Sequence, residues 1–293
     1  MDWKLSFAGL LIGLLVGVTG MGGGSLMTPM LVLLFGFKPS VAIGTDIVHG
    51  AIFKSFGAAQ HRRMGHVHAR LTAWMLLGSA PFSIAGVATA WWLKETYGDG
   101  YEETAKWILG VALIVCGIGF LVKAYLHSAP EDKPFLLRNR DRAIAFATGV
   151  VGGFVVGLTS VGSGTIFGLV IMIAFPLTAA KVVGTDIFHA AILLAVAGAG
   201  HMVAGSVDFH ATAWLLVGSI PGVLVGGLFT VRLPDRILRV ALASTLFLAG
   251  VKLVDPPGAD VVVIGGAVLA VLAVTVGLVR WALGRPAIGS GEA

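Results

Sequence analysis

Residues 44–49, Gly-Thr-Asp-Ile-Val-His, and residues 184–189, Gly-Thr-Asp-Ile-Phe-His, are two copies of one motif that lie 140 positions apart. The same offset relates Thr19 to Thr159, His61 to His201, and the run Thr-Ala-Trp at 72–74 to its copy at 212–214. Chance does not give so many gap-free matches in a merely apolar sequence, and repeats on this scale identify one structural unit that occurs twice. The chain therefore consists of two related halves, which we expect to fold alike.

The composition of the 293 residues suits a lipid bilayer. They are 57% hydrophobic and only 12% charged, with a mean hydropathy of +0.93, whereas a soluble globule needs more polar surface. Apolar runs of about 20 residues, enough to cross a hydrocarbon core of about 30 Å as a helix, recur along the chain. We expect an all-α, polytopic transmembrane helical bundle. The net charge of +5 does not indicate a nucleic-acid partner, because Lys and Arg lie largely in loops.

Each half is predicted to open with an interrupted apolar stretch and to continue with three helices. The ranges are 5–35, 40–60, 71–93 and 104–126 in the first half, 143–175, 178–201, 211–231 and 235–253 in the second, and 261–281 for an unpaired last helix. Ser40 and Thr178 are predicted N-caps. The expected division is 1–126 for the first transmembrane repeat, 127–142 for a cytoplasmic linker, 143–253 for the second repeat, and 254–293 for an extra C-terminal transmembrane helix and tail.

Loop charges predict the orientation of the two halves. The loop with Arg62, Arg63 and Arg70 should be cytoplasmic, yet its repeat partner, residues 201–210, has no Lys or Arg. We therefore expect inverted-topology repeats in the inner, cytoplasmic membrane, with the N-terminus outside and the C-terminus cytoplasmic. This requires each interrupted stretch to be a helical hairpin; a single long broken helix would give parallel repeats and remains the alternative. The first apolar run lacks a small-residue cleavage pattern, so we expect it in the mature protein.

Glycines and small hydroxyl residues interrupt the first apolar stretch of both halves. Its arms, about a dozen residues each, are too short to span alone, so the break lies at membrane depth. There glycine lets main-chain N–H groups approach a ligand, and a helix N-terminus favours an anion. Close helix packing by small residues is the alternative. The predicted substrate-binding residues are Thr19, Gly20, Gly22, Gly23, Gly24 and Ser25, and Thr159, Ser160, Gly162, Ser163, Gly164 and Thr165.

The duplicated motif places an aspartate and a histidine three residues apart, on one helix face. They could couple transport to protons, since histidine titrates near neutral pH, or an Asp–His hydrogen bond could simply support the structure. The residues concerned are Thr45, Asp46, His49, Thr185, Asp186 and His189. The two pairs could also ligate a divalent cation, but no Cys, Glu or further His stands beside them, so we expect neither a metal nor a cofactor.

Three further residues have open roles. His61 and His201 lie at predicted helix ends, where gating competes with plain solvation. Lys54 could attract an anion or extend its charge to the membrane surface, and its repeat partner is Leu194. Cys116 lies in an apolar run, where we expect it to serve packing; as the single cysteine, it excludes a disulfide framework.

With these residues in view, the sequence resembles the sulfite exporter family TauE/SafE. The resemblance rests on the run at 17–25, the Gly-Thr-Asp run at 44–46 and their second-half copies, and it covers nearly the whole chain. It implies export or uptake of sulfur oxyanions and organosulfonates, such as sulfite or sulfoacetate. It does not identify one substrate within that class.

The sequence as a whole predicts a secondary transporter, with export as the expected direction and proton coupling as an option. No G-x-x-x-x-G-K-[ST] motif supports a nucleotide-driven pump, so gradients must supply the energy. The expected partners are a small anion and the bilayer; a second copy of the chain stays open. We expect no enzyme, because an intramembrane enzyme would need Asp46 and Asp186 to converge on a reaction centre. A divalent-cation transporter and a non-transporting scaffold remain alternatives.

Overall fold

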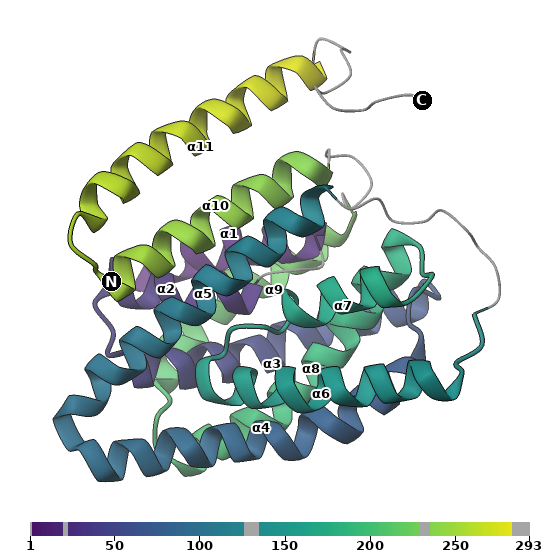
Figure 1. Ribbon diagram of the computed structural model, residues 1–293, viewed down its shortest axis with the longest axis horizontal. Helices are drawn as coiled ribbons and strands as arrows, with labels where there is room; N and C mark the ends of the chain where they lie inside the picture. Colours follow the sequence, from purple (N-terminus) through teal and green to yellow (C-terminus); the bar gives the residue numbers. More distant parts are fainter. Residues whose placement is uncertain (1, 20–22, 126–134, 229–234, 283–293) are drawn as a thin grey trace.

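The computed structural model describes residues 2–19, 23–125, 135–228 and 235–282, and within these ranges the chain is helical with no strand (Figure 1). The predicted all-α class is confirmed. The helices are α1 Asp2–Thr19, α2 Gly23–Phe35, α3 Pro39–Arg63, α4 Ala69–Tyr97, α5 Tyr101–Tyr125, α6 Asn139–Thr159, α7 Ile166–Ala174, α8 Ala179–Val203, α9 Phe209–Leu228, α10 Asp235–Val254 and α11 Ala259–Ala282, with a 3-10 turn at Gly98–Gly100.

Six of the described helices are long and apolar enough to cross a membrane, namely α4, α5, α6, α8, α9 and α11. α6 corrects the expectation that both arms of each interrupted stretch are too short, because its 21 residues suffice to span. α3 has 25 residues but does not qualify by apolarity, since it carries Asp46, His49 and Lys54, all of which are buried. Its polar side chains face the protein interior, where a membrane helix can carry them.

The first helix of each half packs on the third long helix of the other half. α1 lies along α9 and α6 lies along α4. A Cβ added to Gly13 would come within 2.4 Å of the Ser219 carbonyl oxygen, and one added to Gly153 within 2.4 Å of the Ser79 carbonyl oxygen. The two contacts are related by the 140-residue offset. These glycines serve close helix packing, as small residues do in membrane proteins.

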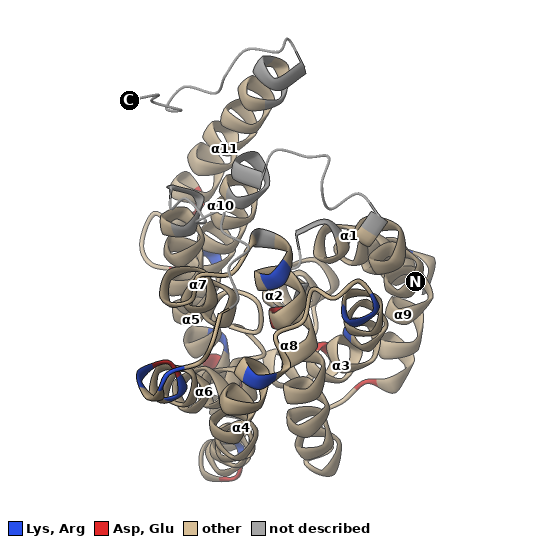
Figure 2. Ribbon diagram, turned by 90° about the vertical axis from the view of Figure 1, so that its right-hand side faces the viewer, with Lys and Arg blue, Asp and Glu red and all other residues tan. Residues whose placement is uncertain are grey.

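α3 and α8, the helices that carry the duplicated motif, lie side by side in the middle of the bundle (Figure 2). The beginning of α3 lies beside the end of α8, because Gly44 contacts Ser206, and the beginning of α8 lies beside the end of α3, because Gly184 contacts His66. The two equivalent helices are therefore antiparallel. Inverted repeats require this relation, although the orientation of the halves in a membrane stays a prediction.

α6 and α7 form a helical hairpin. The Phe167 ring, at the start of α7, lies against Gly152 of α6. The Phe175 ring, just after α7, lies 5.9 Å from the ring of Phe135, which precedes α6. α7 therefore runs back along α6, as predicted for the second half. In the first half the turn residues 20–22 lie outside the described residues.

Two apolar clusters surround the central helices and are built alike. One includes Phe167 and Ile171 of α7 and packs between α3, α4, α6 and α8. The other includes Met27 and Leu31 of α2, at the equivalent positions, and packs between α1, α3 and α9. Both clusters keep the polar residues of α3 and α8 away from lipid.

The start of α3 corrects one predicted cap. Lys38 is its N-cap and Pro39 its first residue, so Ser40 lies inside the helix. The Glu102 carboxylate of α5 accepts hydrogen bonds from the Ser40 hydroxyl (2.6 Å) and main-chain N–H (3.1 Å). A main-chain N–H in the first turn of α3 is thus bound by a carboxylate of another helix, whereas the sequence predicted that the Ser40 hydroxyl would cap this turn. The second prediction is confirmed, because the Thr178 side chain accepts a main-chain hydrogen bond from the first turn of α8.

Candidate functional site

The first-half break is only partly described. Thr19 ends α1 and Gly23 and Gly24 begin α2, whereas Gly20 and Gly22 lie outside the described residues. Ser25 is fully buried, and its Oγ has no hydrogen-bond partner. A buried hydroxyl without a partner is costly and indicates room for a ligand or water atom.

The second-half break, residues 160–165, is a buried loop in which some main-chain donors find no acceptor among the described residues. Ser160, Gly162 and Gly164 have φ values of 63°, 120° and 109°, so the chain leaves the helical conformation at three places. No main-chain N–H of Gly162, Ser163 or Gly164 donates a hydrogen bond to a described residue. Such groups inside a bilayer need a partner, and an anion can supply it.

Two of the predicted hydroxyl donors are engaged by the protein itself. Thr159 Oγ1 donates to the Val155 carbonyl (2.7 Å) and accepts from the Val161 N–H (3.2 Å), so it shapes the start of the loop. Thr165 Oγ1 lies 3.1 Å from Cys116 Sγ. Packing, the role predicted for Cys116, therefore includes holding the end of this loop, and these threonines support the loop.

Asp46 of α3 binds both α2 and the second-half loop. Its Oδ2 accepts hydrogen bonds from Thr28 Oγ1 of α2 (2.5 Å) and from Ser160 Oγ of the second-half loop (2.7 Å). The side chain is 1% exposed, and its Oδ1 has no hydrogen-bond partner. Gly168 stands at the repeat position of Thr28, so Asp186 lacks the corresponding hydroxyl. The two halves do not build equal sites.

The histidines of the duplicated motif bond to serines of the opposite half. His49 Nε2 lies 2.8 Å from Ser219 Oγ, and His189 Nε2 lies 2.9 Å from Ser79 Oγ. In both rings Nδ1 is buried without a hydrogen-bond partner. The suggested bond between Asp46 and His49 is therefore not formed, because each side chain finds its partners on other elements.

The threonines of the motif hold loops. Thr45 Oγ1 accepts a hydrogen bond from the Asp208 N–H (2.9 Å), and Thr185 Oγ1 accepts one from the His68 N–H (3.0 Å). Asp208 precedes α9 and His68 precedes α4, again at the 140-residue offset. Each threonine thus fixes the start of a helix that carries a histidine-bonded serine.

Lys54 contacts the second-half loop, although from the sequence we ranked it below the loops. It is 3% exposed, and its Nζ donates a hydrogen bond of 3.0 Å to Ser163 Oγ. The ammonium also interacts electrostatically with Asp46 and Asp186. A lysine in the middle of an otherwise apolar helix was the available signal, because such a charge in a membrane segment marks a functional site by default.

His61 and His201 are buried at 3% and 4% exposure, so plain solvation is wrong for both. His201 Nε2 lies 2.9 Å from the Gly157 carbonyl oxygen, and its Nδ1 lies 2.9 Å from Ser206 Oγ. His201 thereby joins the end of α8 to α6. For both histidines, a structural role or a gating role therefore stays open.

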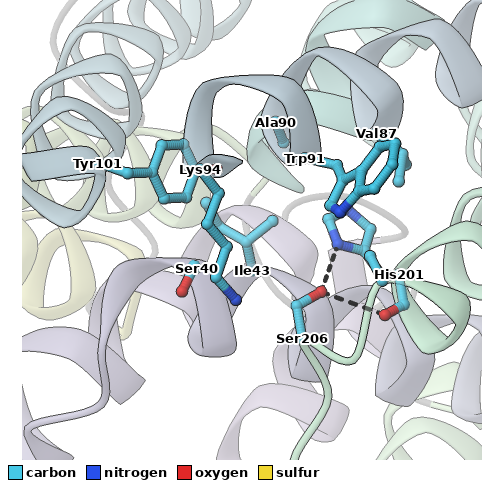
Figure 3. A pocket seen from close by; sticks show the side chains of 10 residues that line it. Ser40, Ile43, Val87, Ala90, Trp91, Lys94, Tyr101, His201 and Ser206 are labelled. Atoms are coloured by element: carbon cyan, nitrogen blue, oxygen red, sulfur yellow. Dashed lines mark hydrogen bonds between the residues drawn. The ribbon is translucent and has the colours of Figure 1, made fainter. Parts of the chain in front are cut away.

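A pocket opens beside His201, at the junction of α3, α4, α5 and the α8–α9 turn (Figure 3). Figure 3 shows the Lys94 and Trp91 side chains of α4 above it, with Ser40 and Ser206 below. None of the predicted substrate-binding residues lines this pocket. It marks the end of the bundle at which α3 begins.

The Asp and His pairs do not converge into a metal site in the part of the chain that the structure describes. No group of three or more His, Cys, Asp or Glu side chains lies close enough there to hold a metal ion. His49 and His189 each use Nε2 for a serine. The donors around residues 160–165 suit an anion instead.

Comparisons with known proteins agree with this architecture. The family model described as sulfite exporter TauE/SafE matches residues 5–253. The chain is 38% identical over 256 residues to the probable membrane transporter protein YjnA of Bacillus subtilis. The aligned residues make up 87% of this chain and all of YjnA. It is 26% identical over 244 residues to the probable membrane transporter protein YdhB of the same organism, covering 83% of this chain and 96% of YdhB.

No solved structure matches the chain. The matched range begins in α1 and ends in α10, so it contains both copies of the duplicated motif and both breaks, and α11 lies beyond it. Six described helices are suited to cross a bilayer. The chain therefore belongs to the sulfite exporter TauE/SafE family and is a multi-pass membrane transporter.

Proposed function

We propose that this protein is a secondary transporter that exports a small sulfur oxyanion or organosulfonate, such as sulfite or sulfoacetate, across the cytoplasmic membrane. The observation that carries the proposal is the buried loop at 160–165. Its main-chain N–H groups at Gly162, Ser163 and Gly164 donate no hydrogen bond within the part of the chain that the structure describes, and Lys54 Nζ donates to Ser163 Oγ. Together with family membership, this supports an anion as the substrate.

The donor set matches the chemistry of a sulfur oxyanion. A sulfite or sulfonate group presents three oxygens, each able to accept hydrogen bonds from N–H and hydroxyl groups. Hydrogen bonds to an anion are stronger than neutral ones, and the low dielectric of the interior strengthens them further. Ser25 Oγ, buried and unpaired, is a further donor at the first-half break.

We infer that transport proceeds by alternating access, and the symmetric exchange of contacts between the two halves supports this inference. In the proposed cycle, the division at 1–126, 127–142 and 143–253 gives two inverted repeats that rock against each other around α3 and α8. The serine–histidine bonds between α3 and α9 and between α8 and α4 lie at this junction. The N-terminus lies outside and the C-terminus in the cytoplasm.

The test is flux of labelled sulfite in proteoliposomes that contain the full-length chain. We expect flux above that of protein-free liposomes, and a fall of about tenfold in Ser163→Ala, because a hydrogen bond to a charged group contributes about 1.5–3 kcal/mol. Ser55→Ala is the matched control, since the Ser55 hydroxyl is exposed and bonds only to the Ala51 carbonyl on the same helix. If sulfite, sulfoacetate and methanesulfonate all fail to move under any gradient, the proposal is wrong.

A further inference from the structure

The membrane interior holds an uneven set of charges. Among the described residues, three Lys, Arg, Asp or Glu side chains are buried, namely Asp46, Lys54 and Asp186. An unpaired charge in a bilayer interior is strongly unfavourable. Two carboxylates and one ammonium therefore need one additional proton to become neutral together.

That proton has few sites to occupy. A protonated His49 or His189 ring would place a second positive charge near Lys54, so the proton resides on one of the two carboxyls. The other helices packed on α3 add little. α2 has no titratable residue, α9 has only His210 in its first turn, and α5 carries its charges near its two ends. α8 itself adds Lys181 in its first turn and His201 in its last, so among the described residues no further charge lies at the middle of α3 and α8.

Lys54 stands between this cluster and the anion-binding loop. Its Nζ donates to Ser163 Oγ at 3.0 Å, while it interacts electrostatically with Asp46 and Asp186. Ser160 of the same loop donates to Asp46. An anion bound to the loop would therefore lie near the Lys54 ammonium and the Ser160 hydroxyl. It would share these two groups with a buried carboxylate.

We propose that Lys54 is the charge partner of the transported anion, and that a monovalent anion takes the place of one carboxylate beside Lys54 while that carboxylate takes up one proton. This inference rests on the proposed function, because it assigns the coupling at the same site. The empty site holds one ammonium, one carboxylate and one proton on the other carboxyl. The loaded site holds one ammonium, the anion and one further proton, so both states are neutral.

The repeat supports a single coupling site. Leu194, 1% exposed, occupies the position of Lys54 in α8, and Gly23 that of Ser163. The cation is thus present once although its helix is duplicated. Transport of one monovalent anion with one proton moves no net charge. The membrane potential therefore does not drive the cycle, whereas the anion gradient and the pH gradient both drive it.

The experiment measures flux of labelled sulfite, and of methanesulfonate as an anion that carries a single charge at every pH used, in proteoliposomes near neutral pH, with valinomycin and potassium setting the membrane potential and with a separate imposed pH gradient. We expect wild-type flux to be the same at inside-negative and inside-positive potentials and to follow the pH gradient. Lys54→Leu, which installs the residue of the other half, should lower flux about tenfold or more, because it removes a charge-assisted contact. Lys54→Arg should keep electroneutral flux.

Lys252→Gln is the matched control, because Lys252 is an exposed lysine paired with Asp260 at 2.7 Å and should leave flux unchanged. Wild-type flux that follows the potential overturns the proton count, and this result needs no variant. Electroneutral flux that persists in Lys54→Leu overturns the role of Lys54; if that variant does not fold, Lys54→Gln carries the same test. Sulfite flux with either result leaves the proposed function standing, whereas the absence of flux in the wild type removes both.

Discussion

Asp46 depends on hydroxyl groups from two other segments. Thr28 and Ser160 both donate to its Oδ2, and Ser160 does so from a left-handed backbone conformation with φ at 63°. For a residue with a Cβ this conformation costs about 1–2 kcal/mol. The hydrogen bond repays that cost, because a buried carboxyl oxygen without its donor is destabilising by about 1–3 kcal/mol.

The residue scale therefore gives a paired prediction for Ser160. Ser160→Ala should lower the unfolding free energy by about 1–3 kcal/mol, because it removes the donor to Asp46 and keeps the strain. Ser160→Gly removes the same donor but relieves the strain, so it should be more stable than Ser160→Ala by about 1 kcal/mol. Thermal unfolding of the two variants in detergent measures the difference. Equal stabilities would contradict the left-handed conformation at this position.

The sequence indicated which segments to propose as the site, but not which partner each side chain contacts. Hydroxyls spaced through residues 159–165 are all equally polar in sequence. Their partners separate them, since Thr165 meets Cys116, Ser160 meets Asp46 and Ser163 meets Lys54. These partners lie 49 to 114 positions away, so no local pattern indicates them.

At the scale of helices, glycine contacts set how closely α1 and α9, and α4 and α6, can approach. Gly13→Val should destabilise the protein by about 3 kcal/mol or more, because the new Cβ would meet the Ser219 backbone and neither backbone can yield cheaply. Gly153→Val should do the same against Ser79. Gly265→Val on α11 is the control, since nothing lies within 4 Å of its Cβ position.

Size-exclusion profiles and thermal unfolding of the three glycine variants would check this. Comparable stability of Gly13→Val and Gly265→Val would show that the α1–α9 contact is looser than described. Gly13 and Gly153, which lie outside the two breaks, are packing residues; for the glycines of the breaks themselves, packing stays the alternative to ligand binding. The sequence could not separate the two roles, because glycine looks the same in a helix crossing and in a ligand loop.

Helix positions were predictable from apolar periodicity, but some ends were not. Thr178 caps its helix locally, as the sequence indicated. Ser40 does not, because Pro39 fixes the first turn and Glu102 supplies the acceptor from α5. α6 continues to Thr159 and can span, whereas α7 has only nine residues. The loop at 160–165 that joins these two arms is buried.

For the whole molecule, the repeat predicts opposite orientations of the two halves. Met64 and Ala204 follow α3 and α8 at equivalent positions. In intact cells, an impermeant thiol reagent should label Ala204→Cys from outside, whereas Met64→Cys should react only after the membrane is opened. Cys116 is buried and should give little background. Labelling of both sites from one side would exclude inverted repeats.

The central claim is that the buried loop at 160–165 binds a small sulfur oxyanion, and thermal unfolding of the purified protein tests it most directly. A ligand that binds the folded state alone raises its stability by about 2.7 kcal/mol at 100 times its dissociation constant. Across sulfite, sulfoacetate, sulfate, acetate, zinc and nickel, we predict stabilisation by a sulfur oxyanion that Ser163→Ala and Lys54→Leu abolish and Ser55→Ala retains. Stabilisation by zinc or nickel alone, or by an anion regardless of these substitutions, would contradict the account.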